Sequence, residues 1–491
     1  MKSGILVGPL LGIESNELYT FCLLTTASVA DVKIVIDGNK IAAAKVGETP
    51  SGQFWRAEYK FPLKPQDESH TYTIELDGEQ ASDKNNRTDW NLDVIGTDSS
   101  PRFAYASCNG FSDAGLREKT SNPYLLWEQL VTEHSNGAFS ILFMGGDQLY
   151  ADEIWSVCSE LSKWSDLPKE EKIKRKATKA MEQQIDSFYD KLYQRRWSHP
   201  AMSRTFSTVP SVMMWDDHDI FDGWGSYPND IQQCDVYQCI FKYAKKYFEL
   251  YQIRSKQNTS LINQSADHYA FSFEYRNYHI LAIDNRAERT LKQVMSTQQW
   301  SDVSKVLQTT KEGQDLLVLS AVPVVYRDFS FTETVFNATP WEEELTDDLK
   351  DHWRAKEHQG ERARLLMNLL DNAKKRKART AILSGDVHIG CLGVVNDNRE
   401  SKAVKIHQVV SSGIVHPSPS RIAWFGIMAV TNDDDEFLNE DETIKVSMLK
   451  PHCSDKYIRS RNFVTIEQGT DNKLWVNWEC EGNDSPIYPL A

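Results

Sequence analysis

The sequence predicts an α/β protein that begins with a small antiparallel β-sandwich. Up to about residue 96, apolar and polar residues alternate in short segments that end at turn dipeptides, a pattern typical of half-buried antiparallel strands. From about residue 101, short continuous apolar runs alternate with long amphipathic segments, which indicates buried strands covered by helices. The length of 491 residues suffices for about two to four domains and for a large core.

The N-terminal strands carry the clearest alternation. Positions 32, 34 and 36 are apolar ahead of the turn Asp37-Gly38, and positions 72, 74 and 76 are apolar ahead of Asp77-Gly78. Such dipeptides favour tight hairpin turns, and the strand spacing favours a sandwich. The polar segment 98–101 is interpreted as a linker. We therefore predict a sandwich domain over residues 1–97 and a second, larger domain over residues 98–491.

The larger domain is predicted to contain seven buried strands and two long helices. The helices are expected at 168–197 and 347–377, where long stretches carry a charged helical pattern. The apolar segment 463–478 fits either a pair of strands within the domain or a subunit interface, so the oligomeric state stays open. The predicted strands are 103–106, 140–144, 211–215, 279–283, 316–319, 380–383 and 404–410.

Charge and composition exclude several classes of protein. The 55 basic and 70 acidic residues give a net charge of −15, which argues against a general binder of long polyanions because such a protein needs a basic face. The eight cysteines are too scattered for a disulfide framework, and they contain no Cys-x-x-Cys zinc pair. No apolar run reaches the about 18–20 residues of a membrane span, and the apolar start lacks a small-residue cleavage site, so we expect a cytoplasmic protein without a membrane partner.

Polar residues gather directly after four of the predicted strands, where ligand sites of open α/β sheets lie. The fragments are SCNG at 107–110, GGDQLYADE at 145–153, DDHD at 216–219 and SGDVH at 384–388. Each fragment alone has a simpler explanation, since a buried Asp can cap a helix and a free Cys often fills a core. Carboxylates gathered on these loops, however, would repel one another unless cations lie among them.

The residue types in these fragments predict a multinuclear metal site. Carboxylates suit calcium or magnesium, whereas a thiolate and a phenolate beside them suit a high-valent transition metal. Two cations a few ångströms apart lower the pKa of bound water and hold an anionic substrate, a combination that serves phosphoester hydrolysis. His218 could donate a proton to the leaving oxygen or hydrogen-bond a phosphoryl oxygen. The candidate ligands are Cys108, Asp147, Tyr150, Asp217, Asp386 and His388.

These motifs, together with YQRRW at 193–197 and IDNRAER at 283–289, resemble the alkaline phosphatase D (PhoD-like) family of calcineurin-like metallophosphoesterases. The resemblance implies a four-layer αββα metallophosphoesterase domain behind the sandwich and hydrolysis of phosphate monoesters or diesters. It also implies Fe³⁺ together with one or two Ca²⁺ ions, with another divalent metal as an alternative at the second site. The expected substrate is a small phosphoester, and nucleic acid is considered only as a diester substrate.

The resemblance also assigns roles to individual residues. Asp147 would bridge the iron to the second metal, and His218 resembles the catalytic histidine of these enzymes. Asn109 could contact substrate or stabilise its turn, and Arg286 could hold a phosphate oxygen or form a buried ion pair with Asp284. The implied iron ligands are Cys108, Asp147, Tyr150 and His388, and the implied ligands of the second metal are Asp147, Asp217 and Asp386.

Some features depart from the resemblance or stay open. The sequence has no twin-arginine export signal, and segments 155–168 and 327–351 look inserted or divergent. Arg195 and Arg196 are expected to be surface or structural residues of a helix instead of substrate clamps. A non-catalytic metal- or phosphate-binding protein with the same fold is the main alternative. A serine hydrolase, a zinc protease and a nucleotide triphosphatase are rejected because GxSxG, HExxH and GxxxxGK[ST] are absent.

Overall fold

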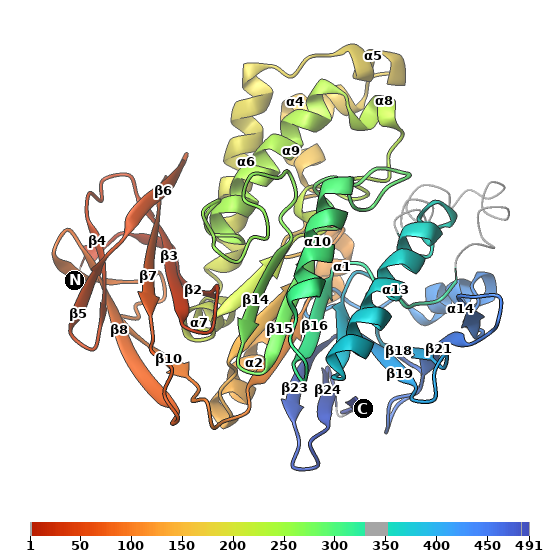
Figure 1. The fold of residues 1–491 in the computed structure, drawn as a ribbon. Coiled ribbons are helices and arrows are strands. Elements are labelled where there is room, and N and C mark those ends of the chain that lie inside the picture. The colour runs from red at the N-terminus through yellow and green to blue at the C-terminus, as the bar shows by residue number, and fades with distance from the viewer. Residues whose placement is uncertain (1, 329–351, 483, 491) are drawn as a thin grey trace.

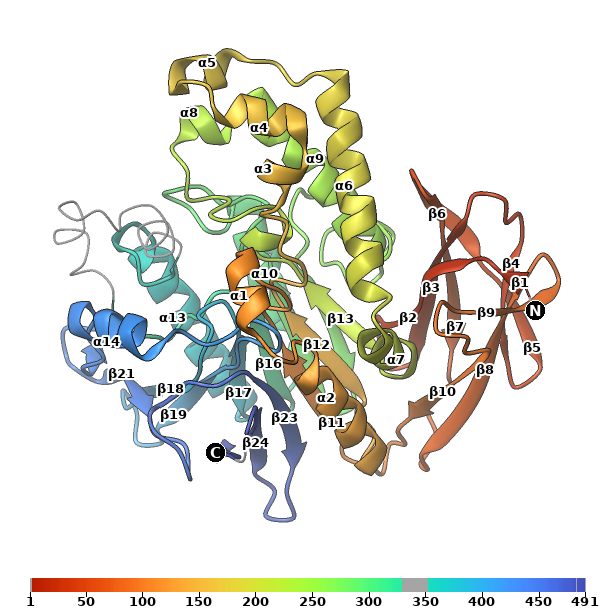
Figure 2. The same cartoon turned by 180° about the vertical axis from the view of Figure 1, so that it is seen from behind.

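The computed structural model describes residues 2–328, 352–482 and 484–490. It confirms the predicted α/β architecture, with a β-sandwich on one side of two facing sheets and helices outside those sheets (Figures 1 and 2). Two predictions fall partly outside the described residues. They are the helical pattern at 347–377, of which 347–351 are not described, and the divergent segment 327–351, of which only Arg327 and Asp328 are described.

The sandwich consists of a four-stranded sheet, in the order β2-β3-β7-β6, and a six-stranded sheet in which β8 pairs with β4, β9 and β10. The alternation predicted for residues 32–36 is present, because every second residue of β4 is buried. The main ladders are antiparallel as predicted, but the short pair β1–β9 is parallel. Phe21 and Tyr72 pack edge to face across the two sheets, with ring centroids 5.1 Å apart. The strands are β1 (Lys2–Ser3), β2 (Ile5–Ile13), β3 (Leu18–Thr26), β4 (Val32–Ile36), β5 (Asn39–Ala42), β6 (Ala44–Thr49), β7 (Gly52–Lys60), β8 (Glu68–Leu76), β9 (Glu79–Ser82) and β10 (Asp89–Val94).

The remaining strands form two mixed sheets that pack face to face. The six-stranded sheet has the order β13-β12-β11-β23-β24-β25, and the nine-stranded sheet has the order β14-β15-β16-β17-β19-β18-β21-β20 with β22 beside β18. Phe103 and Tyr278 join them with ring centroids 5.0 Å apart. The strands are β11 (Arg102–Ala106), β12 (Ile141–Gly145), β13 (Ser211–Met214), β14 (Phe271–Tyr275), β15 (Tyr278–Ile283), β16 (Asp315–Ser320), β17 (Thr380–Ser384), β18 (Gly390–Asp397), β19 (Val404–Val410), β20 (Glu436–Phe437), β21 (Ile444–Leu449), β22 (Tyr457–Ile458), β23 (Asn462–Gln468), β24 (Leu474–Cys480) and β25 (Ile487–Leu490).

All seven predicted buried strands are present, with ends shifted by a residue or two. They form the parallel core of the two sheets, with β11, β12 and β13 side by side in one and β15, β16, β17 and β19 in the other. The segment 463–478 supplies β23 and β24, and β23 pairs with β11 of the same chain. The apolar C-terminal segment therefore packs within the sheet.

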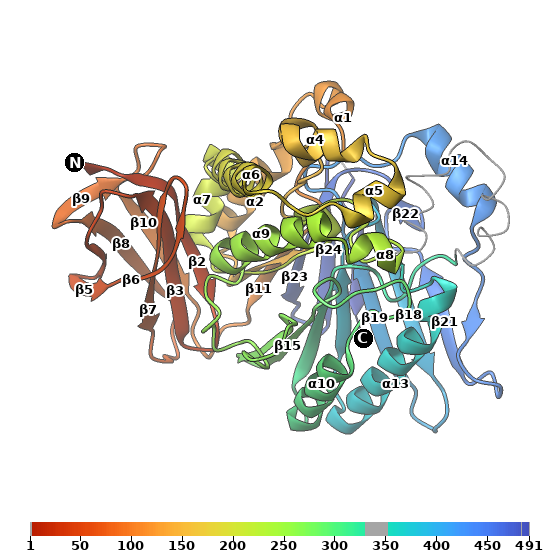
Figure 3. The ribbon, with the colours of Figure 1, turned by 90° about the horizontal axis from the view of Figure 1, so that it is seen from above.

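Helices cover the outer faces of the two sheets, which gives the four-layer αββα arrangement (Figure 3). Helices α10 and α13 bury an apolar cluster against β15, β16 and β17. Within the described residues, no helix has the length and apolar character needed to cross a membrane. The helices are α1 (Ala114–Lys119), α2 (Leu125–Asn136), α3 (Ile154–Val157), α4 (Ser159–Ser165), α5 (Lys169–Lys174), α6 (Lys179–Trp197), α7 (Pro200–Thr208), α8 (Asn229–Gln232), α9 (Asp235–Tyr251), α10 (Thr297–Thr309), α13 (Gln359–Arg376) and α14 (Arg421–Val430), with the 3₁₀ turns η1 (Asp217–Asp219) and η2 (Lys356–His358).

The prediction of one long helix at 168–197 is wrong in one respect, because this segment forms two helices, α5 and α6. The carboxylate of Asp235 accepts a hydrogen bond from the backbone N of Ala177 at 2.7 Å, which holds that residue outside a helix. Thr178 then caps α6 by accepting from the N–H of Met181 at 3.2 Å. The other predicted helix, 347–377, has its regular α-helical part only from Gln359.

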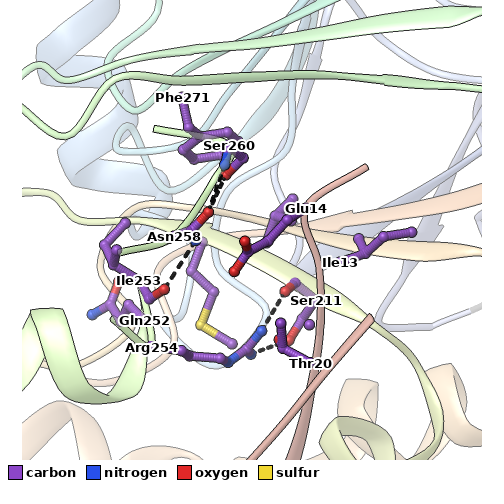
Figure 4. A pocket seen from close by; sticks show the side chains of 13 residues that line it. Ile13, Glu14, Thr20, Ser211, Gln252, Ile253, Arg254, Asn258, Ser260 and Phe271 are labelled. Carbon is purple, nitrogen blue, oxygen red and sulfur yellow. Dashed lines mark hydrogen bonds between the residues drawn. The ribbon is translucent and has the colours of Figure 1, made fainter. Parts of the chain in front are cut away.

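A buried charged cluster joins the sandwich to the sheets, and Figure 4 shows the cavity of about 10 Å³ beside it. Arg254, which follows α9, donates from Nη1 to the carbonyl of Ser211 and from Nη2 to its hydroxyl, both at 2.6 Å. On the sandwich side, Glu14 accepts from Arg56 at 2.6 Å and, across the junction, from the backbone N of Thr259 at 2.7 Å. Such a cavity holds one water molecule at most. The sandwich is therefore fixed to the sheets by buried polar contacts as well as by apolar packing.

Candidate metal centre

The predicted ligands lie in loops at the carboxyl ends of four parallel strands. Cys108 follows β11, Asp147 follows β12, Asp217 lies in η1 after β13, and Asp386 follows β17. Because β11 to β13 belong to one sheet and β17 to the other, the loops of both sheets meet at one edge. The structure thus brings together side chains that are far apart in the sequence.

The backbone at these loops is unusual. Cys108, Asp147, Asp386 and His388 all have left-handed backbone conformations, with φ of 50°, 52°, 69° and 55°. This region costs a residue with a side chain about 1–3 kcal/mol, and such residues concentrate at functional sites. The turns bring the ligand atoms of Cys108, Asp147 and His388 into one group and place Asp386 in a separate acidic group, so the strained backbone serves to position the candidate ligands.

Three groups of side chains could each hold a metal ion. Within each group, the ligand atoms lie within 4.8 Å of one another. Asp147 belongs to two of the groups and so stands between them. Cys108 Sγ lies 3.4 Å from Asp147 Oδ2, and Tyr150 Oη lies 3.1 Å from His388 Nε2. The groups are Cys108 with Asp147 and His388, Asp147 with Asp217 and His218, and Asp216 with Asp217 and Asp386.

The electrostatics of the site favour cations. Burial, followed by the nearby Asp147 carboxylate, raises the pKa of the Cys108 thiol well above its ordinary value. Burial also raises the pKa of Asp147, which faces Asp216 and Asp217. Burial and the neighbouring His416 lower the pKa of His388, which keeps its imidazole in the neutral, metal-binding form. Without cations, therefore, the protein disfavours the anionic forms of these thiol and carboxyl groups.

One orphaned atom tests directly whether metal ions fit. Asp147 Oδ1 is buried and has no hydrogen-bond partner among the residues that the structure describes. An unsatisfied buried carboxylate oxygen is costly, and a coordinated cation would satisfy it. The donor set of thiol, phenol, imidazole and carboxyl groups therefore fits two or more metal ions that share Asp147.

His218 is held firmly at the edge of the cluster. Its Nδ1 lies 2.8 Å from Asp152 Oδ2, and its ring stacks on Tyr150 with centroids 4.2 Å apart. Burial alone would lower the pKa of His218, but the charges of Asp152 and Asp217 outweigh it and raise the pKa well above the ordinary value. Asp152 thus orients the ring.

Asn109 and Arg286 are both buried and have partners within the protein. The amide of Asn109 donates to the carbonyl of Gln148 at 3.2 Å and accepts from Trp127 Nε1 at 2.9 Å, contacts that stabilise its turn. The guanidinium of Arg286 pairs with Asp216 and lies 3.4 Å from Asp217 Oδ1.

The expected ion pair of Arg286 with Asp284 takes a different form. Asp284 Oδ1 accepts from the backbone N of Arg286 at 2.9 Å, while the guanidinium lies beside the acidic ligands. Arg286 thereby offsets part of their mutual repulsion.

Several residues at the site were missed by sequence analysis. Ser412 Oγ lies 3.0 Å from Cys108 Sγ and accepts from the backbone N of His388 at 2.7 Å. The ring of His416 stacks on His388 with centroids 3.5 Å apart. Both follow β19, which was predicted, so the polar segment SSGIVH after that strand was the signal that could have found them.

Two further residues approach the acidic group. Asp216 is fully buried and was seen in the sequence only as a neighbour of Asp217. His352 Nδ1 lies 3.8 Å from Asp386 Oδ2, and His352 is buried. His352 belongs to no helix or strand, so no pattern in the sequence marked it.

Comparison with known proteins supports the fold and the family. Over 355 residues the chain is 28% identical to the uncharacterised protein YGR266W of Saccharomyces cerevisiae, which covers 58% of this chain. The chain spans about half (49%) of the length of that relative. Among solved structures, PhoD matches with a TM-score of 0.60 and 12% identity, covering 99% of this chain and 89% of PhoD.

A second structure points the same way. The purple acid phosphatase PPD1 from yellow lupin (Lupinus luteus) seeds matches with a TM-score of 0.52 and 13% identity, over 99% of this chain and 74% of that one. At such identities the likeness shows a shared calcineurin-like fold. The family model described as PhoD related phosphatase matches residues 86–341 and 338–432, which together cover more than half of the sequence. The chain therefore belongs to the PhoD related phosphatase family.

Proposed function

We propose that this protein hydrolyses phosphate esters, either monoesters or diesters, at the metal centre described above. The proposal is carried by one observation: buried acidic and soft ligand atoms form adjacent groups that share Asp147. Metal ions in such a pair of sites bind the phosphoryl oxygens and lower the pKa of a coordinated water. The family and the fold, both those of phosphatases, support the same activity.

We infer that the two metal sites differ in character. Cys108, Tyr150 and His388 offer a thiolate, a phenolate and an imidazole, the donors that suit Fe³⁺. Asp217 and Asp386 offer only carboxylates, which suit one or two Ca²⁺ ions or another divalent cation. Asp147 is the ligand that both sites would share.

The residues of the chain provide the proton chemistry. With Nδ1 of His218 fixed to Asp152, the other ring nitrogen is left to donate a proton to the leaving oxygen. We infer that Arg286 acts through Asp216 and Asp217 by holding the acidic ligands in place. Asn109, whose amide is engaged by Gln148 and Trp127, holds the loop that carries Cys108.

The substrate is proposed to be a small phosphoester. The net charge of −15 disfavours long nucleic acid and anionic membrane surfaces, because both would be repelled at long range. A non-catalytic metal- or phosphate-binding protein is the second candidate. The partly buried His218–Asp152 pair favours the enzyme, since a pure binding site has no use for an oriented proton donor.

Metal analysis combined with turnover tests the proposal. In the wild-type protein we expect about one iron with calcium per chain and hydrolysis of 4-nitrophenyl phosphate or bis(4-nitrophenyl) phosphate. Asp147→Asn removes the shared carboxylate and is expected to lose metal and turnover while keeping the fold. Asp455→Asn, a change at a side chain that is 95% exposed, is the matched control. Wild-type activity in Asp147→Asn would contradict the proposed site.

A second variant separates the enzyme from the binding protein. His218→Ala is expected to keep the metal content and to slow hydrolysis by about 10²–10⁴-fold, the usual effect of losing a general acid. Metal bound in both proteins, with no turnover of either ester by the wild type, would favour the non-catalytic candidate.

A further inference from the structure

A cleft of about 350 Å³ opens beside the metal centre. Tyr150 and Asp152 form its inner side, next to the metal ligands and His218. Its outer walls come from residues 111–117 and from the C-terminal end of α6, where Arg195 and Arg196 lie. The volume is that of a small-molecule site, so the cleft can hold the part of a substrate that is not cleaved.

Of the six charged residues that line this cleft, Asp152, Glu153 and Arg195 have partners, and the carboxylate of Asp113 accepts from the backbone N of Leu116 at 3.0 Å. Asp152 contacts His218 and accepts from the backbone N of Asp222 at 2.7 Å. Glu153 forms an ion pair with Arg195. These contacts leave the positive charges of Arg196 and Arg117 to be explained.

Arg196 is a half-buried guanidinium with few partners. Its side chain makes one long hydrogen bond, from Nη1 to Tyr124 Oη at 3.4 Å, and in the described part of the chain it has no carboxylate at ion-pair distance. A Cβ placed on Gly110 would lie 3.0 Å from Nη2 of Arg196, so the guanidinium lies against the loop that begins with Cys108. Arg117, on the opposite wall, is exposed and likewise has no carboxylate partner in the described residues.

A guanidinium carries five N–H donors in a rigid fork that matches a carboxylate or a phosphate. Partial burial of such a group is costly when its charge and donors are left without an acceptor. The unused donors of Arg196 line a cleft whose inner side is formed by metal-centre residues. An anionic group in the cleft would satisfy them.

We propose that Arg196, with Arg117 at the rim, binds a second anionic group of the substrate. The preferred substrate is then a small phosphoester with a carboxylate or a second phosphate on the part that is not cleaved. This assignment rests on the proposed phosphoesterase function and goes beyond it by naming the substrate class. It also revises the expectation from the sequence that Arg196 is only a structural residue of its helix.

The test uses phenyl phosphates that differ only in the para group. One carries a carboxymethyl group, one a phosphonomethyl group and one a neutral carboxamidomethyl group of similar size. We expect kcat/KM of the wild type to be about tenfold or more higher for at least one anionic compound than for the neutral compound. The compound preferred distinguishes a carboxylate site from a phosphate site.

Variants assign this preference to Arg196. Arg196→Gln is expected to remove it, Arg196→Lys to restore part of it, and Arg117→Gln to weaken it. Lys191→Gln removes one positive charge from an exposed position of the same helix outside the cleft and should leave the preference unchanged. An equal rate for charged and neutral esters, or the same preference in Arg196→Gln, would overturn the proposal.

If the protein hydrolyses none of these esters, a binding measurement tests the anion site instead. The same para groups on benzylphosphonate, which cannot be hydrolysed, are titrated into the metal-loaded protein by calorimetry. Tighter binding of an anionic compound that Arg196→Gln abolishes would support the anion site even if the proposed hydrolysis fails. Equal affinities of the charged and neutral compounds would overturn the anion site whether or not hydrolysis occurs. Arg196→Lys and Arg117→Gln keep this test open if Arg196→Gln does not fold.

Discussion

At the scale of single residues, Asp219 is the side chain on which two ligand-bearing loops converge. Its carboxylate accepts from the backbone N–H groups of Gln148 at 3.2 Å, Leu149 at 3.1 Å and Asp216 at 2.9 Å. Gln252 Nε2 donates to it as well, at 2.9 Å. Asp219 thus fixes the loop after β12 to the loop after β13, although it belongs to none of the three groups of ligand atoms.

Asp219→Asn is expected to weaken both the fold and the metal site. The new amide presents an NH₂ group where backbone N–H donors need an acceptor, which should lower the free energy of unfolding by about 2–3 kcal/mol. The loops that carry Asp147 and Asp217 would lose their common anchor, so metal affinity should fall. Denaturant unfolding and metal titration measure the two effects, with the exposed Asp455→Asn as control. Unchanged metal affinity would show that the loops are held in another way.

At the scale of secondary-structure elements, β19 carries a buried imidazole in the middle of the nine-stranded sheet. His407 is 3% exposed, and burial together with Lys405 lowers its pKa from 6.5 to about 4. Between these two pH values, His407 is protonated in the unfolded chain but stays neutral in the folded protein. The free energy of unfolding should therefore fall as the pH drops through this window.

The variant His407→Gln should lose less stability on acidification. Between pH 7 and pH 4.5 we expect the wild type to lose about 2 kcal/mol more than the variant. Denaturant unfolding at both pH values measures the difference. His452→Gln is the matched control, because His452 is exposed and its ring stacks on Tyr488, an aromatic neighbour that it shares with His407. Parallel pH profiles of the wild type and His407→Gln would contradict the prediction.

The strands also show how far the sequence predicts the fold. Strands of the parallel core were predicted because each is a continuous apolar run, whereas β18 was not, since Gly390 and Gly393 interrupt its pattern. A side chain at Gly390 would meet Trp478, and one at Gly393 would meet Val325, contacts that exist only in the folded protein. The division between α5 and α6 likewise depends on Asp235, a residue distant in sequence.

The same limit applies to the site. Asp147 and Asp386 could be predicted because each follows a recognisable parallel strand. His352 could not, since it reaches the site from a segment without regular structure. The unused N–H donors of Arg196 could not be predicted for another reason, because a sequence does not show which charged side chains form ion pairs in the folded protein.

At the scale of the whole molecule, the sandwich and the sheets meet at Gly12 and Arg254. A Cβ on Gly12 would overlap the guanidinium of Arg254, which is held by Ser211, and also Oγ1 of Thr20. Gly12→Ala is therefore expected to displace Arg254 and to destabilise the protein by about 1–3 kcal/mol. Arg254→Ala leaves the Ser211 carbonyl unpaired and should cost about as much.

A double-mutant cycle tests whether this contact couples the two parts. Because truncation of Arg254 removes its share of the overlap and leaves only the contact with Thr20 Oγ1, the double variant should be more stable than the sum of the single effects by about 1–2 kcal/mol. Denaturant unfolding of the four proteins gives the coupling. Gly360→Ala, at a position with no atom within 4 Å of the added Cβ, is the control for the substitution itself. Strict additivity would mean that Gly12 and Arg254 act independently.

The proposed metal ligands come from both sheets, which has a consequence for how the protein matures. Cys108 leaves β11 in one sheet, and His388 follows β17 in the other, 280 positions further along the chain (388 − 108). No partly folded chain in which the sheets are still separate can present both ligands to one ion. Metal capture is therefore a late event that follows sheet docking, and a captured ion clamps the sheets together by mass action. Cation supply would then govern the lifetime of the folded protein as well as its chemistry.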